Sequence, residues 1–397
     1  MLLGSYYILR PVRDTFATVF GVGSLQQLFT ATFVGTVLAS WAYTALASRV
    51  RLVRLLPGVF WLWTASIALF AILLRLEPAS RLLDGAYYVW FSVANLFMIS
   101  LFWSLMVDVF TPAQATRFFG AIAAGGAIGA IAGPIATRLL VGRLGLDGLL
   151  WLAAAGFLLD LALVHMLMRE KAQLRLHGDE TQQSTLDDSL HGSALDGFRQ
   201  LLRSRFVRNQ AAFMLLMTWV NTVAYFVQTD LIARSFEAIA ARAQAIADID
   251  LVVNVCTALI LVLGLGRIVR HFGVTVGLVL NPLLMIIAFL ATALSPTLFM
   301  VQGLQVVRRV AQYAIARPSR EICFTVVEQG SRYKAKNVVD TVIYRFGDVS
   351  SAWVQAGMRA LGFGLGATIA LGVGASVAWG AVALRLGQRF EELRGKS

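Results

Sequence analysis

The chain has 397 residues, of which 58% are hydrophobic and 14% charged, and its mean hydropathy is +0.72. Soluble globular chains are about 45–50% apolar and about 25% charged, so this composition excludes a soluble domain, a disulfide-stapled scaffold and a disordered regulator. The net charge of +12 is expected from basic loops of a membrane protein, and no nucleic-acid partner is predicted. Its two cysteines form neither a disulfide framework nor a four-ligand metal site, and no cofactor or metal is expected.

Hydropathy windows of about 19 residues predict an all-α polytopic membrane protein with twelve transmembrane helices. The predicted helices lie near residues 2–20, 25–48, 55–75, 85–109, 118–141 and 146–168, then near 209–233, 246–266, 273–294, 296–316, 337–358 and 362–386. The polar stretch 169–208 is predicted to be a cytoplasmic linker between an N-terminal six-helix half (1–168) and a C-terminal six-helix half (209–397). This organisation is typical of a major-facilitator-like fold built from two parallel repeats.

The basic residues predict an orientation in the bilayer. With both termini in the cytoplasm, 22 of the 34 Lys and Arg residues fall in inner loops or the C-terminal segment, and 7 fall in outer loops. The excess of Lys and Arg on one side favours cytoplasmic N- and C-termini. We therefore expect a multi-pass protein of a bacterial inner membrane. The remaining five basic residues are arginines inside predicted helices.

The first helix carries charges in its middle, where burial is costly and usually serves a cavity or a partner. Arg10 and Asp14 are four residues apart and are predicted to pair on one face, which would leave Arg13 available for another anion. Pro11 removes a backbone hydrogen bond one turn back, an irregularity tolerated where a helix lines a cavity. The alternative is that the helix begins near Phe16 and that this stretch is an interfacial ramp.

The tenth helix carries adjacent arginines followed by polar residues. Arg309, Gln312 and Tyr313 are predicted to share one face by the 3.6-residue period, whereas Arg308 points about 100° away. An anion-binding role for Arg309 competes with a structural pair to a carboxylate of the eleventh helix. Guanidinium groups bind phosphate oxygens bidentately, so this face suits a phosphorylated solute.

The eleventh helix carries acidic and aromatic residues at four-residue steps, namely Asp340, Tyr344 and Asp348, with Arg345 three before Asp348. Lys334 and Lys336 stand at its predicted cytoplasmic end. In the fifth helix, Gly125, Gly129 and Gly133 are also spaced by four, which predicts a small-residue face for close helix packing. A phosphate-binding loop is excluded there, because no Lys-Ser/Thr follows the glycines and no strand precedes them.

Four motifs, in order along the chain, resemble those of the nucleotide translocases, the ATP/ADP antiporters of plastids and intracellular bacteria. They are Tyr7-Ile8-Leu9-Arg10-x-x-Arg13-Asp14; Phe102-Trp103 with Asp108; Tyr313-Ala314-x-x-x-Pro318-Ser319-Arg320-Glu321; and Lys334-Ala335-Lys336-x-Val338-x-Asp340. The resemblance implies twelve helices, nucleotide counter-exchange without hydrolysis, and phosphate contacts from Arg13 and Lys336. Arg13 stands where that family has Lys, and Gln228 stands where its seventh helix has an acid.

These patterns lead to the hypothesis of an antiporter or permease in the lipid bilayer that carries nucleotides or a related phosphorylated anion by alternating access. The candidate substrate-binding residues are Arg10, Arg13, Asp14, Asp108, Gln228, Arg309, Tyr313, Lys334, Lys336, Asp340 and Arg345. Arg13, Arg309 and Lys336 would bind the anion, and Asp14, Asp108 and Asp340 would be their partners. An enzyme is disfavoured, since no nucleophile, base and orienting group assemble. Two alternatives stay open: a proton-coupled permease of another solute, using Asp108, Asp340 or Asp348, and a non-transporting membrane sensor or assembly partner.

Overall fold

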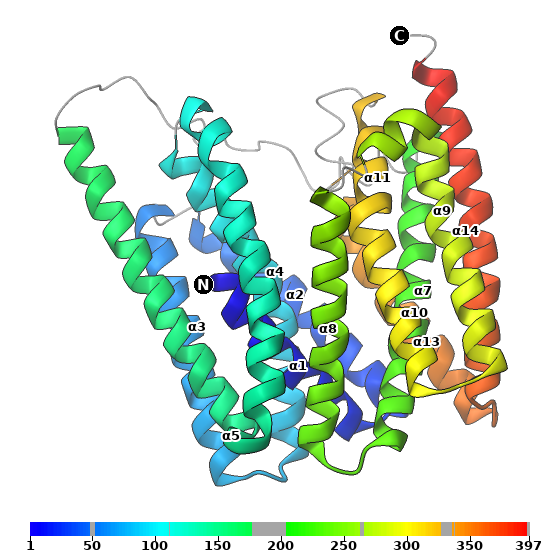
Figure 1. Cartoon of the computed structure of the whole chain (residues 1–397), viewed down its shortest axis with the longest axis horizontal. Helices are drawn as coiled ribbons and strands as arrows, with labels where there is room; N and C mark the ends of the chain where they lie inside the picture. The colour runs from blue at the N-terminus through cyan, green and yellow to red at the C-terminus, as the bar shows by residue number, and fades with distance from the viewer. Residues whose placement is uncertain are drawn as a thin grey trace. The chain divides into compact units, whose positions relative to one another are not determined.

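The computed structural model describes residues 1–47, 52–110, 112–176, 204–262, 266–326, 336 and 338–394. Every element assigned within those ranges is helical (Figure 1). The longer helices are α1 (Leu2–Phe20), α2 (Leu25–Ala47), α3 (Leu52–Leu76), α4 (Arg81–Val109), α5 (Pro112–Leu176), α7 (Arg205–Ser235), α8 (Ile239–Val262), α9 (Gly266–Leu294), α10 (Leu298–Ala311), α13 (Tyr344–Ala360) and α14 (Leu365–Arg394). The predicted all-α class is confirmed. Most of the predicted linker, residues 177–203, lies outside the described residues.

Seven segments of the described chain are long and apolar enough to cross a membrane. One of them, Arg117–Met166, contains the fifth predicted helix and most of the sixth, which α5 joins across a break at Gly145. Gly145 has φ 72°, a left-handed conformation that a side chain would strain. A second break of this kind, at Gly273 with φ 83°, separates the first turns of α9 from its membrane-spanning part. The fold is therefore a polytopic bundle of the predicted type, with several boundaries moved.

Helix α8 starts at Ile239, seven residues before the predicted start at 246. The prediction was wrong here because Arg242 lowers the hydropathy before residue 246, and Asp248 lowers it just after. In the structure both are paired: Arg242 donates to the carbonyl oxygen of Phe236 at 2.8 Å, and Asp248 accepts from Arg138 at 2.6 Å. A charged side chain that has a hydrogen-bond or ion-pair partner does not end a helix.

The described chain divides into two compact units. Unit 1 comprises Met1–Phe20, Thr30–Ser189 and Phe236–Leu251, and unit 2 comprises Gly21–Phe29, Leu190–Ser235 and Val252–Ser397. The first half of α8 thus belongs to unit 1, although it follows the seventh helix in sequence. Each unit has its own apolar core of buried side chains.

In unit 1, α1 packs closely on α5. A Cβ atom added at Gly129 would lie 2.9 Å from the backbone nitrogen of Gly4, and one added at Gly133 would lie 2.6 Å from the carbonyl oxygen of Gly4. The predicted small-residue face is confirmed at these two positions. It was wrong for Gly125, where a Cβ would meet no described atom within 4 Å, because α1 meets that turn of α5 at the neighbouring Gly126, where a Cβ would lie 3.0 Å from Leu3 Cδ1.

Helix α1 runs without interruption from Leu2 to Phe20, with Pro11 inside it. The alternative that the helix begins near Phe16 was therefore wrong. The hydroxyl of Thr15 donates to the carbonyl oxygen of Pro11 at 2.7 Å, so Thr15 adds a side-chain contact to the backbone beside the proline. Leu9 and Val12 on this helix are fully buried. The charged stretch of α1 is thus part of a packed helix.

In unit 2, α14 lies beside α7 and α9 (Figure 1). Trp379 of α14 packs against Phe213 of α7, with ring centroids 5.4 Å apart, and Phe289 of α9 fills the space over Gly372. The core therefore fixes these three helices against one another.

The predicted tenth and eleventh helices contain two π-helical turns, η1 (Gln312–Ala316) and η3 (Val339–Ile343). After η1 the chain continues as α11 (Arg317–Cys323) and the short 3₁₀ turn η2 (Phe324–Val326), and after η3 it continues as α13. A π turn inserts one residue into a helix and rotates the side chains beyond it, and such turns are frequent at functional sites. Both lie in segments singled out from the sequence.

Candidate functional site

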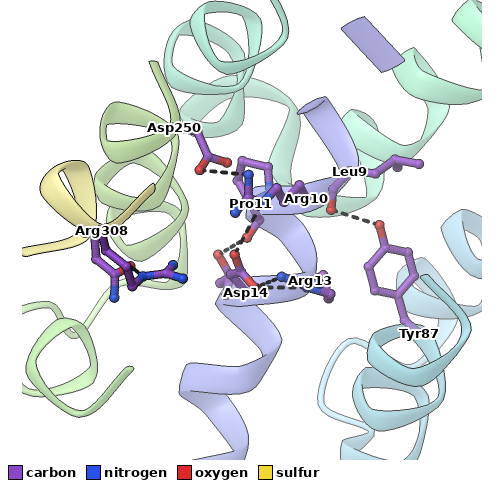
Figure 2. Close-up of polar contacts among 10 residues, drawn as sticks. Leu9, Arg10, Pro11, Arg13, Asp14, Tyr87, Asp250 and Arg308 are labelled. Atoms are coloured by element: carbon purple, nitrogen blue, oxygen red, sulfur yellow. Dashed lines mark hydrogen bonds and ion pairs between the residues drawn. The ribbon is translucent and has the colours of Figure 1, made fainter. Parts of the chain in front are cut away.

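Four charged side chains of unit 1 meet around the middle of α1, and we call them the α1 cluster: Arg10, Arg13, Asp14 and Asp250 (Figure 2). Arg13 donates to Asp14 Oδ1 from Nη2 at 2.5 Å and from Nε at 2.9 Å. Arg10 lies 3.5 Å from Asp250 Oδ1 through Nη1 and 4.0 Å from Asp14 Oδ2 through Nε. The arginine side chains are 11% and 16% exposed, and the carboxylates are 3% and 0% exposed.

Aromatic rings surround the guanidinium groups of this cluster. Arg10 lies over the ring of Tyr7 at 5.8 Å, and Arg13 lies over Tyr88 at 5.5 Å and Phe91 at 5.8 Å. These distances are within cation–π range. Tyr87 donates its hydroxyl proton to the carbonyl oxygen of Leu9 at 3.2 Å (Figure 2). The α4 rings of Tyr88 and Phe91 thus cover the Arg13 guanidinium, and the α1 ring of Tyr7 covers that of Arg10.

Charge balance explains how this cluster can be buried. Two guanidinium groups face two carboxylates, so the net formal charge of the α1 cluster is zero. Breaking a buried pair by removing one partner typically costs about 3–5 kcal/mol, because the other charge is left uncompensated. An anion that enters here must therefore compete with Asp14 or Asp250 for an arginine.

The expectation that Arg13 would stay available for another anion was wrong. Arg13 folds back along α1 to its neighbour Asp14, while Arg10 reaches both Asp14 and Asp250. The sequence could not show this partition, because Asp250 comes from α8, about 240 residues later. One signal was present: Asp250 is an acidic residue within an apolar stretch, and an intramembrane carboxylate calls for a partner.

Unit 2 has a second polar group, in which α7 meets α10 and α13. Arg308 donates to Gln305 Oε1 at 2.9 Å and to Asn221 Oδ1 at 3.1 Å. Arg345 lies 3.6 Å from Asp348, whose Oδ1 accepts from Thr222 at 3.0 Å. The arrangement fixes α7 to both helices through hydrogen bonds inside the bundle.

The side-chain registers expected for the tenth and eleventh helices are changed by the π turns. Arg309 is 2% exposed and belongs to α10, whereas Tyr313 lies within η1, where the 3.6-residue period no longer holds. Tyr313 instead carries the guanidinium of Arg317 over its ring at 5.1 Å. Asp340 lies within η3, so the assumed four-residue step to the eleventh-helix residues is broken.

A third group of charges lies where η3 meets α11. Asp340 accepts a hydrogen bond from Arg320, which also lies 3.7 Å from Glu321. Lys336 Nζ lies 2.5 Å from Glu321 Oε2. The four side chains alternate in sign, from Lys336 to Glu321, Arg320 and Asp340, and join α11 to the start of the predicted eleventh helix. Sequence reasoning had missed Arg320 and Glu321 as partners.

Three further candidate residues complete the set. Gln228 is 2% exposed on α7, and its Oε1 accepts no hydrogen bond from a described residue. The side chain of Asp108 and the whole of Lys334 lie outside the described residues. Among the described side chains, no group of three or more His, Cys, Asp or Glu could hold a metal ion.

Comparison with solved structures identifies the fold. The chain is similar to a bacterial homologue of the human lysosomal transporter Spinster in an inward-facing, unoccupied conformation (16% identity, TM-score 0.56, 98% of this chain and 94% of that chain). It is also similar to the nucleoside transporter NupG (13%, 0.66, 99% and 97%) and to a bacterial homologue of the iron transporter ferroportin in an inward-facing state (15%, 0.66, 97% and 97%). No protein-family model matches the chain, and no curated protein matches it by sequence. The fold is therefore major-facilitator-like.

Proposed function

We propose that this protein is a membrane transporter that carries a small anionic solute, a nucleotide or a related phosphorylated anion, by alternating access. The similar structures of this fold are those of transporters, of which one is named for nucleosides and another holds 5-aminolevulinic acid. The α1 cluster is the observation that supports an anionic solute. Ionisable residues inside a membrane helix are costly to bury and by default mark a functional site. We place the protein in a bacterial inner membrane with both termini in the cytoplasm.

The cluster supports binding by exchange of partners. A phosphate group would replace the Asp14 carboxylate on Arg13, where the planar guanidinium can donate two parallel hydrogen bonds. Arg10 would keep Asp250, so that one arginine stays neutralised while the other holds the solute. The aromatic faces of Tyr88 and Phe91 keep the Arg13 guanidinium in place during this exchange. Unloading returns Arg13 to Asp14 and restores a neutral, buried cluster.

The other predicted residues are assigned within this proposal. Arg309 and Lys336 would supply further positive charge to the solute, in line with the resemblance noted for Lys336. Asp340 would act through Arg320, and Arg345 through Asp348, as partners that hold the cations of unit 2 in place. Gln228 and Tyr313 are proposed as neutral hydrogen-bonding groups for the solute.

Counterflow in proteoliposomes tests the proposal directly. Purified protein would be reconstituted into vesicles loaded with one unlabelled nucleotide, and uptake of labelled nucleotides would be followed across a panel. Arg13→Ala should reduce uptake at low nucleotide concentration about tenfold or more, and Arg13→Lys should reduce it less, because Lys keeps the charge and loses the bidentate geometry. Complete absence of counterflow for folded wild-type protein would overturn the antiporter proposal.

One observation favours a second function, a proton-coupled permease of another solute. The α1 cluster has one carboxylate for every guanidinium, so protonation of Asp14 or Asp250 would release an arginine without any anion. The two functions differ in what drives uptake. Exchange requires solute on the opposite side and little proton gradient, whereas the coupled permease requires an inward proton gradient and no internal solute.

A further inference from the structure

A second basic site lies in unit 2, away from the groups considered above. A cavity of about 330 Å³ opens between the start of α7 and the end of α14. Its lining consists of Arg205, Arg208, Asn209, Arg385, Gln388, Arg389 and Glu392. Four guanidinium groups therefore converge on this cavity against one carboxylate, from two stretches of chain about 180 residues apart.

The helix geometry explains the convergence. Arg385 and Arg389 are one turn apart on α14, and Arg205 and Arg208 are one turn apart on α7. Phe206, Leu386 and Phe390 are buried in the core of unit 2 and hold the two helix ends together. Because these apolar side chains face the core, the four arginines lie on the exposed side of the two helix ends. Like charges one turn apart on a helix are mildly destabilising. A bound anion would relieve this repulsion.

The acidic residues near the end of α14 do not neutralise all the arginines that line the cavity. Glu392 lies 3.7 Å from Arg389. Its neighbour Glu391 does not line the cavity and accepts a hydrogen bond from Thr275 of α9 at 2.7 Å. In the described part of the chain, neither Arg205 nor Arg385 forms an ion pair. Among the described residues that line it, the cavity therefore has four guanidinium groups and one carboxylate.

The backbone of α7 adds to the attraction for an anion. Arg205 is the first residue of a 31-residue helix, and the unbonded N–H groups of a helix N-terminus carry partial positive charge. The hydroxyl of Ser204 accepts from the backbone N–H of Val207 at 3.3 Å and caps one of these groups. The arginine side chains and the helix end thus favour the same kind of ligand.

The position of the cavity indicates where that ligand comes from. Two candidate membrane spans, Arg205–Ser235 and Leu365–Arg394, have their ends at the cavity. Leu384 and Leu393, which flank its α14 lining, are 47% and 40% exposed and can contact acyl chains. Basic pockets between transmembrane helices at the cytoplasmic surface suit anionic lipid headgroups.

We propose that this cavity binds a phosphate group presented at the membrane surface, that of an anionic phospholipid such as phosphatidylglycerol. Arg385 and Arg389 clasp the phosphate from α14, and Arg205 and Arg208 do so from α7. The lipid thereby bridges the two helix ends. Inorganic phosphate offers the same chemistry in soluble form, and a binding comparison separates the two sources.

The full-length protein would be purified in detergent, and its binding of dioleoyl phosphatidylglycerol, dioleoyl phosphatidylcholine and inorganic phosphate would be measured by native mass spectrometry. We expect wild type to retain phosphatidylglycerol in preference to phosphatidylcholine. The double variant R385Q/R389Q should weaken phosphatidylglycerol binding roughly tenfold, as expected for loss of charge-assisted hydrogen bonds. R75Q, which removes an exposed arginine at the end of α3, is the matched control and should bind as wild type does.

Equal phosphatidylglycerol binding by wild type and R385Q/R389Q would overturn the proposal. Displacement of the lipid by equimolar inorganic phosphate would also overturn it, since the cavity would then be a site for the free ion. Should the double variant not remain monodisperse, R385K/R389K keeps the charge and loses the bidentate geometry. A drop of several-fold is expected for it, and undiminished binding would contradict the assignment. The transport proposal is tested separately, by nucleotide counterflow, so failure of the lipid-binding test and failure of the transport test can be told apart.

Discussion

The α1 cluster of unit 1 and the charged groups of unit 2 satisfy buried charge in different ways. Helix α1 is continuous and packed backbone to backbone on α5 through Gly129 and Gly133. The helices that carry the charges of unit 2 contain the π turns η1 and η3. In unit 1 a continuous helix holds the charges, and the exchange of their partners is our proposal. In unit 2 the helices that carry the charges contain irregular turns, which change the directions of the side chains beyond them.

The largest expected effect is the loss of the shared carboxylate of the α1 cluster. Asp14→Asn removes the anion that faces both Arg10 and Arg13, and we expect it to lower stability by about 3–5 kcal/mol. The measurement is thermal unfolding of the detergent-purified protein. The matched control is Asp248→Asn, which breaks the partly exposed pair with Arg138 and should cost about 0–1 kcal/mol. Equal losses for the two variants would show that burial does not distinguish the pairs.

The packing of α1 on α5 comes next. Gly133→Ala places a methyl group 2.6 Å from the carbonyl oxygen of Gly4, a clash with backbone that overpacking data put at about 1–3 kcal/mol. Gly125→Ala, where no described atom lies within 4 Å, should be neutral or mildly stabilising because Ala is the better helix former. A ranking of these two variants by unfolding temperature checks the prediction, and the reverse ranking would refute the close contact.

A smaller effect is expected where η3 meets α11. Asp340→Asn leaves the buried Arg320 with Glu321 as its acidic partner among the described residues, 3.7 Å away, and should cost about 1–2 kcal/mol. The comparison with Asp14→Asn is informative, because Asp340 is 29% exposed and Asp14 only 3%. A loss for Asp340→Asn as large as that for Asp14→Asn would remove the contrast between the two units.

The smallest effect is expected at Lys336. The side chains of Lys336 and Glu321, which pair, are 35% and 47% exposed. Glu321→Gln should therefore change stability by less than about 1 kcal/mol. Transport is the informative readout here. If Lys336 binds the solute, Lys336→Gln should reduce counterflow while Glu321→Gln should leave it largely intact. The same loss in both variants would assign Lys336 a structural role.

The sequence predicted those features that depend on local spacing. The bounds of α1 and the small-residue contact at Gly129 and Gly133 follow from composition and the helical period. The pair between Arg10 and Asp14 was also predicted, although at 4.0 Å it is the longest contact of the cluster. Each of these requires only that residues one turn apart share a face.

Contacts set by tertiary structure could not be predicted from the sequence. Asp250 reaches Arg10 because the first half of α8 packs into unit 1, which no local pattern encodes. The π turns η1 and η3 change the register of Tyr313 and Asp340, and a 3.6-residue period assumed throughout gives wrong faces beyond them. Arg13 pairs closely with Asp14, while Arg10 lies nearer to Asp250 of α8 than to Asp14, and this division depends on how α8 packs.

Solute saturation of counterflow by Arg13→Gln, measured beside Arg138→Gln, tests the central claim most directly. Both variants remove one arginine from unit 1, but Arg13 is 16% exposed in the α1 cluster and Arg138 is 56% exposed outside it. If the α1 cluster binds the anion, Arg13→Gln raises the half-saturating nucleotide concentration about tenfold or more, and Arg138→Gln leaves it unchanged. Saturation curves for Arg13→Gln and Arg138→Gln that both coincide with that of wild type would contradict the account.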